Sequence, residues 1–178
     1  MKKALVALAV VTFALASVPA DAGSNVFVGA GYVWPADVDG TAYVTGGIRI
    51  KAGPVAIEPE VGYWKKSEGV EDLVRISLSD LSFGANLVFA PDLTGKVGVY
   101  FGAGAALHRL KLTGTLIGIS ESASENKFGA QGFAGIDFKL SDPVWLFATG
   151  RYDYVTKVKG LDLSLSGFKV YGGLRINF

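Results

Sequence analysis

Hydrophobic and polar residues alternate one for one along much of the chain. In the segment from Phe168 to Phe178 the apolar side chains share one parity, whereas Lys169, Arg175 and Asn177 share the other. A period of two residues is typical of a β-strand with one apolar and one polar face. A strand of about ten residues is long enough to cross a bilayer when it is tilted. The pattern therefore predicts strands that cross a membrane.

Eight such strands are predicted, separated by segments that contain glycine, proline and polar residues. They cover residues 25–34, 42–51, 55–64, 73–90, 96–108, 128–139, 144–154 and 168–178. Three short connections contain Pro54, Pro91 and Pro143, and they alternate with four others, of which 65–72 is a polar loop and 110–127 is the longest. Outer-membrane barrels show this alternation of short periplasmic turns with longer extracellular loops.

Two positions disturb the regular pattern. Pro59 lies inside a predicted strand, where proline removes a hydrogen-bond donor, so we expect a β-bulge there. Ile76 and Leu78 are out of phase with the apolar residues that follow them. Either a bulge near Ser79 corrects the phase, or this part of the strand lies outside the bilayer.

The charged residues of five predicted strands all share the parity opposite to the apolar residues. They are Arg49, Lys51, Glu58, Glu60, Asp137, Lys139, Arg151, Asp153, Lys169 and Arg175. A basic residue that faces lipid at the middle of a bilayer costs about 2 to 4 kcal/mol, whereas a soluble barrel would place its charges outside. We therefore expect an all-β fold, an eight-stranded antiparallel up-and-down transmembrane β-barrel. Only closure satisfies every backbone group in lipid. Eight spanning strands then leave both termini on the same side of the membrane, which we expect to be the periplasm.

These inward charges are predicted to form a network in the lumen. At eight strands the interior of a barrel is filled by side chains. The bases and acids are nearly balanced, and buried charges need partners, so we expect ion pairs that plug and stiffen a non-conducting lumen. A narrow porin-like solute conduit is the alternative.

Aromatic residues lie near the ends of several predicted strands on the outward parity. Tyr32, Trp34, Tyr63, Tyr152 and Tyr154 are the predicted interfacial aromatics. Girdles of aromatic residues mark both membrane interfaces of outer-membrane barrels.

The beginning of the chain has the pattern of a secretory signal peptide. A basic start at Lys2 and Lys3 precedes an apolar stretch over 4–18, and Ala20 and Ala22 form an A-x-A cleavage site. Residues 1–22 are therefore predicted to be removed, and residues 23–178 to form one barrel domain. The remaining chain has about equal numbers of acidic and basic residues, which argues against a nucleic-acid partner, and it contains no cysteine.

Several short motifs resemble those of a known family. They are EPEVGYW at 58–64, GANLVF at 84–89, YFGAGAA at 100–106, GRYDY at 150–154 and GLRINF at 173–178. Together they resemble the eight-stranded outer-membrane barrels of the OmpA/OmpX and opacity-protein type. The resemblance implies an outer-membrane location among lipid and lipopolysaccharide. It also implies recognition of Tyr171, Leu174, Ile176 and Phe178 by the barrel-insertion machinery.

A structural or adhesive role at the cell surface is the function that we expect. The alternating runs 75–79, 110–113 and 161–166 are suited to extend strands above the membrane, and exposed strand edges capture partners by strand addition. The partner would be a host or surface ligand bound through extracellular segments.

We expect no enzymatic activity, cofactor or metal. A lipid-modifying enzyme of the outer leaflet is the alternative, with His108 beside Ser120, Glu121, Ser122 and Ser124, although the motifs of such enzymes are not found. The sequence at 37–40 is similar to the start of a calcium loop but lacks the distal glutamate, so a solvated turn is expected.

Overall fold

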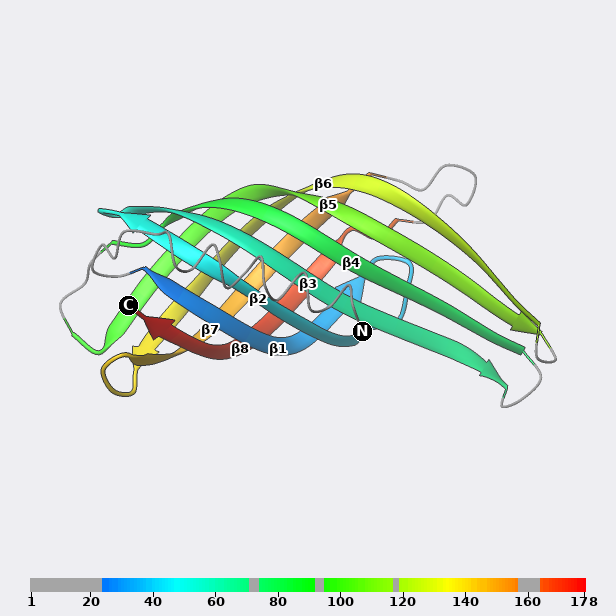
Figure 1. Ribbon diagram of the computed structural model, residues 1–178, viewed down its shortest axis with the longest axis horizontal. Coiled ribbons are helices and arrows are strands. Elements are labelled where there is room, and N and C mark those ends of the chain that lie inside the picture. Colours follow the sequence, from blue (N-terminus) through cyan, green and yellow to red (C-terminus); the bar gives the residue numbers. More distant parts are fainter. Residues whose placement is uncertain (1–23, 71–73, 92–94, 117–118, 157–163) are drawn as a thin grey trace.

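The computed structural model describes residues 24–70, 74–91, 95–116, 119–156 and 164–178. It consists of eight antiparallel strands that close into one barrel, as the alternating pattern predicts (Figure 1). The strands are β1 (Asn25–Pro35), β2 (Thr41–Ala52), β3 (Val55–Val70), β4 (Val74–Phe89), β5 (Val97–Leu116), β6 (Ile119–Lys139), β7 (Val144–Val155) and β8 (Gly167–Asn177). In the part of the chain that is described, no helix is both long and apolar enough to span a bilayer.

Closure occurs between the first and the last strand. β1 and β8 pair along their whole length, from Asn25 opposite Asn177 to Pro35 opposite Gly167. The backbone N–H of Phe178 also donates to the carbonyl of Ser24 at 2.9 Å. A closed ladder leaves no sheet edge in the barrel wall, which is the condition for a sheet to exist in hydrocarbon.

The wall of the barrel is apolar outside and polar inside. Leu87 and Phe128 expose 65% and 73% of their surface to the exterior, whereas Arg49 and Arg151 expose 2% each. A barrel in water would bury its apolar side chains and expose its charges. The predicted transmembrane barrel is therefore confirmed, with lipid around its outer surface.

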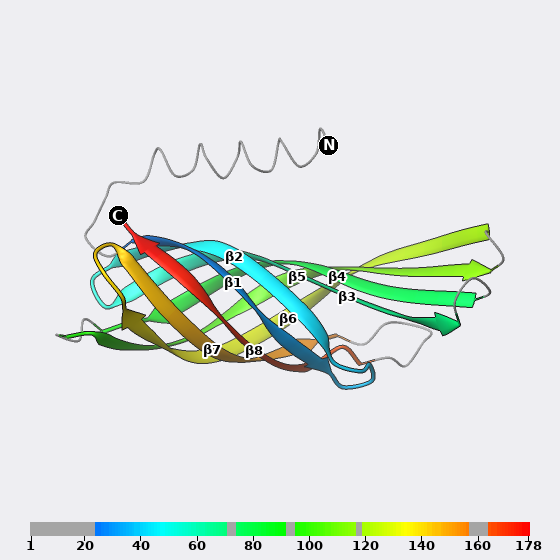
Figure 2. The same cartoon turned by 90° about the horizontal axis from the view of Figure 1, so that it is seen from below.

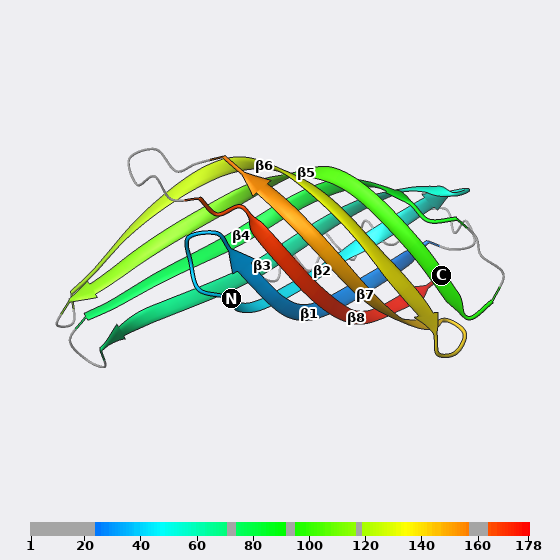
Figure 3. The same ribbon diagram turned by 180° about the vertical axis from the view of Figure 1, so that it is seen from behind.

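Four adjacent strands are much longer than the other four. β3, β4, β5 and β6 contain 16, 16, 20 and 21 residues, whereas β1, β2, β7 and β8 contain 11 or 12. The long strands project beyond the barrel at the end opposite Phe178 (Figures 2 and 3). We call the projecting part the extension and define it as 65–70, 74–79, 111–116 and 119–124.

The extension replaces two predicted loops. Residues 65–70 continue β3, and most of 110–127 forms the ends of β5 and β6, so the predicted loops at 65–72 and 110–127 are wrong. The runs 75–79 and 110–113 do lengthen strands, as predicted. In the run 161–166, residues 161–163 lie outside the described part and 164–166 are not in a strand.

The phase change in β4 has no bulge behind it. β4 keeps one register with β3 and with β5 from Val74 to Phe89. The polarity of the faces reverses instead, because Ile76 and Leu78 belong to the extension, where water replaces lipid on the outer face. Of the two predicted alternatives, the unbroken register excludes the bulge and leaves the location outside the bilayer.

Pro59 does not introduce a bulge either, so that prediction is wrong. It pairs with Ala85 of β4 in an unbroken register. On the β2 side the ladder passes from Gly47↔Glu60 to Ile50↔Ile57, which skips two pairs without inserting a residue. The gap adjoins Pro59, which has no N–H to contribute to a ladder.

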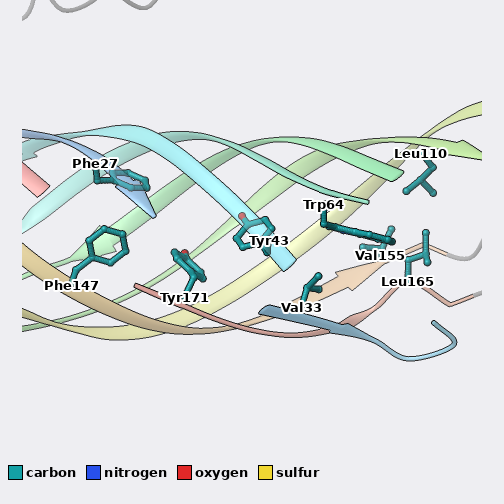
Figure 4. Close-up of a cluster of buried hydrophobic side chains, with 9 residues drawn as sticks. All are labelled: Phe27, Val33, Tyr43, Trp64, Leu110, Phe147, Val155, Leu165 and Tyr171. Atoms are coloured by element: carbon teal, nitrogen blue, oxygen red, sulfur yellow. The ribbon is translucent and has the colours of Figure 1, made fainter. Parts of the chain in front are cut away.

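Apolar side chains occupy part of the lumen (Figure 4). The cluster consists of Phe27, Val33, Tyr43, Trp64, Leu110, Phe147, Val155, Leu165 and Tyr171. Figure 4 shows Trp64, Leu110, Val155 and Leu165 together at one end of the cluster, with Phe27 and Phe147 at the other. Leu78 of the extension packs against the cluster, so this apolar group lies below the base of the extension.

Candidate functional site

Two arginines pair with two acids at the end of the lumen that lies near the short turns and Phe178. Arg49 of β2 contacts Glu58 of β3 at 2.6 Å, and Arg175 of β8 donates to both oxygens of Asp137 at 2.7 and 2.9 Å. Arg49 Nη1 also lies 3.9 Å from Asp137, and its guanidinium lies 4.3 Å from the ring centre of Tyr100. Four strands are thus linked by one set of charges, which satisfies the need of buried ions for partners.

An open cavity of about 240 Å³ lies beside this group. Lys51 and Trp145 line it together with Arg49, Asp137 and Arg175. Lys51 is only partly buried there.

Lys139 is placed differently from the other predicted network residues. Its Nζ pairs with Asp142 of the turn at 2.6 Å, and both side chains are partly or largely exposed. Lys139 therefore belongs to the rim, and it takes no part in the buried pairs.

A second group crosses the middle of the lumen. Arg151 of β7 donates two hydrogen bonds of 2.5 Å to Glu60 of β3. Glu60 also accepts from the Tyr43 hydroxyl at 3.1 Å and from Asn86 at 3.5 Å, and Gln131 donates to Asn86. These residues come from five strands, so their side chains form a layer across the barrel.

A third group lies one layer closer to the extension. Lys169 of β8 pairs with Asp153 of β7 at 2.5 Å, and its Nζ lies 4.5 Å from the ring centre of Tyr43. Nine of the ten predicted network residues therefore lie in the lumen or line its cavity, with Lys139 on the rim. Asn86, Gln131 and Tyr43 were not predicted as members, although their inward parity was a usable signal.

Asp80 and His108 form a buried pair that the sequence analysis did not predict. His108 Nδ1 lies 2.8 Å from Asp80 Oδ2, and both residues are at most 3% exposed. Both have inward parity on neighbouring strands, which is the signal that could have found them. The serines predicted beside His108 do not lie next to it. Ser124 lies opposite Lys111, which is three residues, or about 10 Å, further along β5 than His108. The structure does not bring the proposed Ser-His-acid set together.

Glycines make room for the polar layer. A Cβ at Gly104 would overlap the Asn86 side chain, and one at Gly62 would overlap the Tyr43 hydroxyl. The small residues in these strands thus allow long polar side chains to cross the lumen.

The five predicted interfacial aromatics all face outward. Tyr32, Trp34, Tyr63, Tyr152 and Tyr154 are exposed, and they lie near the end of the barrel wall from which the extension projects. Exposed phenylalanines occur at the opposite end of the wall. They are Phe89, Phe101, Phe138 and Phe178.

The residues of the predicted insertion signal lie on two faces of β8. Leu174, Ile176 and Phe178 are exposed on the outside, whereas Tyr171 is 4% exposed and packs in the lumen against Tyr43. The predicted signal peptide and its cleavage site lie outside the described residues.

The aspartates of the turn at 37–40 have protein partners. Asp37 accepts a hydrogen bond from the backbone of Ser164 at 2.7 Å, and Asp39 lies 3.8 Å from Lys66 Nζ. These contacts are those of a turn held to its neighbours.

β6 has an open edge beside the short strand β7. Among the described residues, the ladder between them starts at Gly129↔Val155, and the Thr156 N–H donates to the Phe128 carbonyl at 3.2 Å. Residues 119–127 extend beyond this point, and among the residues that the structure describes their ladder partners are those of β5 alone. Backbone groups of alternate residues point to the same side of a strand, so those of Ser122, Ser124 and Asn126 face the open side, as Phe128 does.

Solved structures with the same fold are outer-membrane barrels. Neisserial surface protein A is 18% identical with a TM-score of 0.72, covering 88% of this chain and 97% of its own. A major outer membrane protein from Thermus thermophilus is 12% identical with a TM-score of 0.68, covering 87% and 98%. Ail, the attachment invasion locus protein of Yersinia pestis, is 18% identical with a TM-score of 0.52, covering 86% and 99%. At these identities the likeness shows the fold.

Among curated protein sequences, none matches the chain significantly. The family model of the outer membrane protein beta-barrel domain, in contrast, matches residues 4–175. The closed eight-stranded barrel, its lipid-facing exterior and its polar lumen agree with that match. The chain therefore belongs to the outer membrane protein beta-barrel domain family and is a barrel of the outer membrane.

Proposed function

We propose that this protein is a non-enzymatic surface protein whose barrel anchors the extension and whose extension binds an extracellular partner. In this arrangement both ends of the chain are periplasmic, residues 1–22 are removed after Ala22, and the extension stands outside the cell. The short turns on the side of Phe178 support this orientation, because short turns are periplasmic in bacterial outer-membrane barrels.

The open edge of β6 is the observation that carries the proposal. Exposed edges present unpaired N–H and C=O groups, and an extended peptide can add to them as a further strand. The open segment 119–127 is long enough for several such pairs, and it contains no proline and, before Lys127, no lysine. Proline and lysine are the residues with which proteins usually protect an edge.

The other edge of the extension, on β3, is better protected. Lys65 and Lys66 lie at its base, and the Thr41 hydroxyl donates to the Lys65 carbonyl at 2.9 Å. Gly69 has a φ of 150°, which departs from the regular strand conformation. The contrast favours β6 as the edge that receives a partner.

One relative supports a surface ligand in general terms. Ail of Yersinia pestis, in a second structure with a TM-score of 0.54, is in complex with the heparin analogue sucrose octasulfate. By analogy, the projecting part of the present barrel is the surface on which we expect a ligand.

The filled lumen supports an anchoring role for the barrel. Three layers of buried ion pairs cross it, which favours a non-conducting interior over a narrow solute conduit. Stable, selective single-channel currents in a planar bilayer would favour the conduit instead. We further infer that the insertion machinery recognises β8 before folding, through Tyr171, Leu174, Ile176 and Phe178.

The edge is tested by proline substitution. Pro at Ser122 and Ser124 removes two N–H groups that face the open side, while the bonds between β5 and β6 are retained. The measurement is the amount of a surface ligand that intact cells retain. Cells with the wild-type protein should retain the ligand, and cells with Ser122→Pro/Ser124→Pro should not. The matched Ser122→Ala/Ser124→Ala variant, which keeps both N–H groups, should bind normally. Equal binding by the proline and alanine variants would contradict strand addition at this edge.

A further inference from the structure

The open cavity at the turn end of the lumen lies at the opposite end of the barrel from the extension. Its volume is about 240 Å³, and residues of β2, β5, β6, β7 and β8 contribute to its lining. Pockets for drug-sized ligands have volumes of about 300 to 1,000 Å³. The cavity therefore suits a smaller molecule, such as a single aromatic ring with one substituent.

Small residues on one side of the barrel make room for this cavity. Ala90, just after β4, and Gly98 of β5 line it, whereas β2, β7 and β8 contribute long side chains. The backbone does not require glycine at position 98, because a Cβ there would lie in ordinary contact with the Cβ of Asp137, at 3.5 Å. The lack of a side chain at Gly98 thus leaves space in the lumen that a larger residue could fill.

Two buried arginines line the cavity and are held firmly in place. The guanidinium of Arg175 lies between 4.7 and 5.5 Å from the centres of three aromatic rings, those of Phe147, Tyr100 and Phe27. The guanidinium of Arg49 also packs on the ring of Tyr100. Donors that are fixed in advance lose little conformational entropy when a ligand binds.

Positive charges exceed negative ones around the cavity. Arg49, Lys51 and Arg175 line it, and Asp137 is the acid of the described lining. Glu58, which pairs with Arg49, adds a second acid. Within the described residues three cations thus meet two carboxylates, and a ligand with one negative charge balances them.

The remaining wall of the cavity is partly apolar. Trp145 lies in the lining and is partly buried, and Ala90 and Pro91 face the same space. An indole ring packs well against a second flat ring. The lining therefore combines a surface for an aromatic ring with guanidinium groups, whose planar donors match the two oxygens of a carboxylate.

The cavity is closed on the side of the extension. The rings of Phe27 and Phe147 pack edge to face beyond the arginines, with centres 5.7 Å apart. The layer of Arg151 and Glu60 crosses the lumen further along. A ligand would therefore enter and leave at the turn end, as in a blind binding site.

We propose that this cavity binds a small aromatic carboxylate, with its carboxylate at Arg49, Lys51 and Arg175 and its ring against Trp145. In the proposed orientation the cavity opens to the periplasm, so the ligand is a periplasmic solute. Binding at this site requires neither the extension nor the edge of β6.

Calorimetric titration of the full barrel in zwitterionic detergent with benzoate tests the proposal. Benzoate should bind saturably with a dissociation constant in the millimolar range, as expected for so small a ligand. Benzylammonium has the same ring with a positive charge and should not bind. Phenyl phosphate, which carries two negative charges at neutral pH, should bind no more tightly than benzoate.

Two lysines at the same end of the barrel provide a matched pair of variants. Lys51→Met removes a cation of the lining and should weaken benzoate binding about ten-fold, because a hydrogen bond between charged groups is lost. Lys139 lies on the rim, pairs with Asp142 and is not part of the lining, so Lys139→Met should bind benzoate like the wild type.

A third variant fills the cavity without changing its charge. Gly98→Leu should abolish benzoate binding while the barrel keeps its heat-modifiable migration on gels. No saturable binding of benzoate to the wild type, equal affinity of the two lysine variants, or equal binding of benzylammonium would overturn the proposal. Unchanged binding by Gly98→Leu would also overturn it, and the lysine comparison decides if that variant does not fold. Ser122→Pro/Ser124→Pro should bind benzoate normally, so failure of strand addition at β6 is distinguishable from failure of this site.

Discussion

Four of the eight strands run from the barrel wall into the extension in one continuous register, yet the faces of the two regions have opposite polarity. On the outward side of β5, Ala103 and Leu107 in the wall are followed by Arg109, Lys111 and Thr113. On the inward side of β5, His108 in the wall is followed by Leu110 and by Leu112 in the extension. A β-strand alternates in the same way in both regions, so the solvent decides which face is apolar. The position of the reversal therefore marks the edge of the hydrocarbon.

The largest change in the free energy of unfolding is expected when a buried ion pair of the lumen is broken, compared with an exposed ion pair of the extension. Arg151→Leu leaves Glu60 buried in the wall without its partner, which should lower the free energy of unfolding by about 3 to 5 kcal/mol. Lys66→Leu removes a largely exposed ion pair of the extension, between Lys66 and Asp39, and should change the free energy of unfolding by less than about 1 kcal/mol. Urea unfolding in lipid vesicles, followed by tryptophan fluorescence, measures both. Glu60→Gln/Arg151→Leu should recover much of the loss, and a loss as large as in the single variant would argue against pairing as its cause.

The second prediction compares substitution by arginine at two positions on the outer face of β5, one in the wall and one in the extension. Ala103→Arg places a cation in the apolar wall and should cost about 2 to 4 kcal/mol, because it faces hydrocarbon. Thr113→Arg lies on the same face ten residues later, in the extension, where a surface substitution usually changes stability by less than about 0.5 kcal/mol. The same unfolding assay applies. Similar costs at both positions would show that the two sites share one environment.

The smallest effect on stability is expected from shortening the extension. Deleting 112–123 and joining Lys111 to Ser124 through Asn-Gly removes a hairpin that has few contacts with the wall. The barrel should retain heat-modifiable migration on gels and its unfolding free energy to within about 1 kcal/mol, while surface binding is lost. A barrel that no longer folds would show that the extension stabilises the wall.

Much of the wall could be predicted from the sequence, because a lipid-bathed barrel forces strict alternation. The inward parity of Arg49, Glu60, Arg151 and Lys169 followed from the cost of charge in hydrocarbon. The partners within the lumen could not be predicted, since they depend on the stagger between strands. The bond from Arg151 to Glu60 joins strands that are far apart in sequence.

The extension was harder to predict. Its polarity is reversed, and the segment 110–127 is rich in serine, glycine and glutamate, which resembles a loop. The pair between Asp80 and His108 lies next to this reversal, where the inward parity had already lost its clear pattern. The β-bulge predicted at Pro59 was wrong for a different reason, because a ladder can skip pairs beside proline without inserting a residue.

A cysteine scan along the outward face of β5 locates the reversal directly, and the chain has no cysteine to interfere. Variants with a single cysteine at Phe101, Ala103, Leu107, Lys111 or Thr113 are reconstituted into vesicles and treated with a water-soluble maleimide. We expect the first three to be protected and the last two to react fully, both on intact cells and in vesicles. Protection of Lys111→Cys and Thr113→Cys, or reaction at Phe101→Cys and Ala103→Cys, would contradict an outer face of β5 that leaves the hydrocarbon between Leu107 and Lys111.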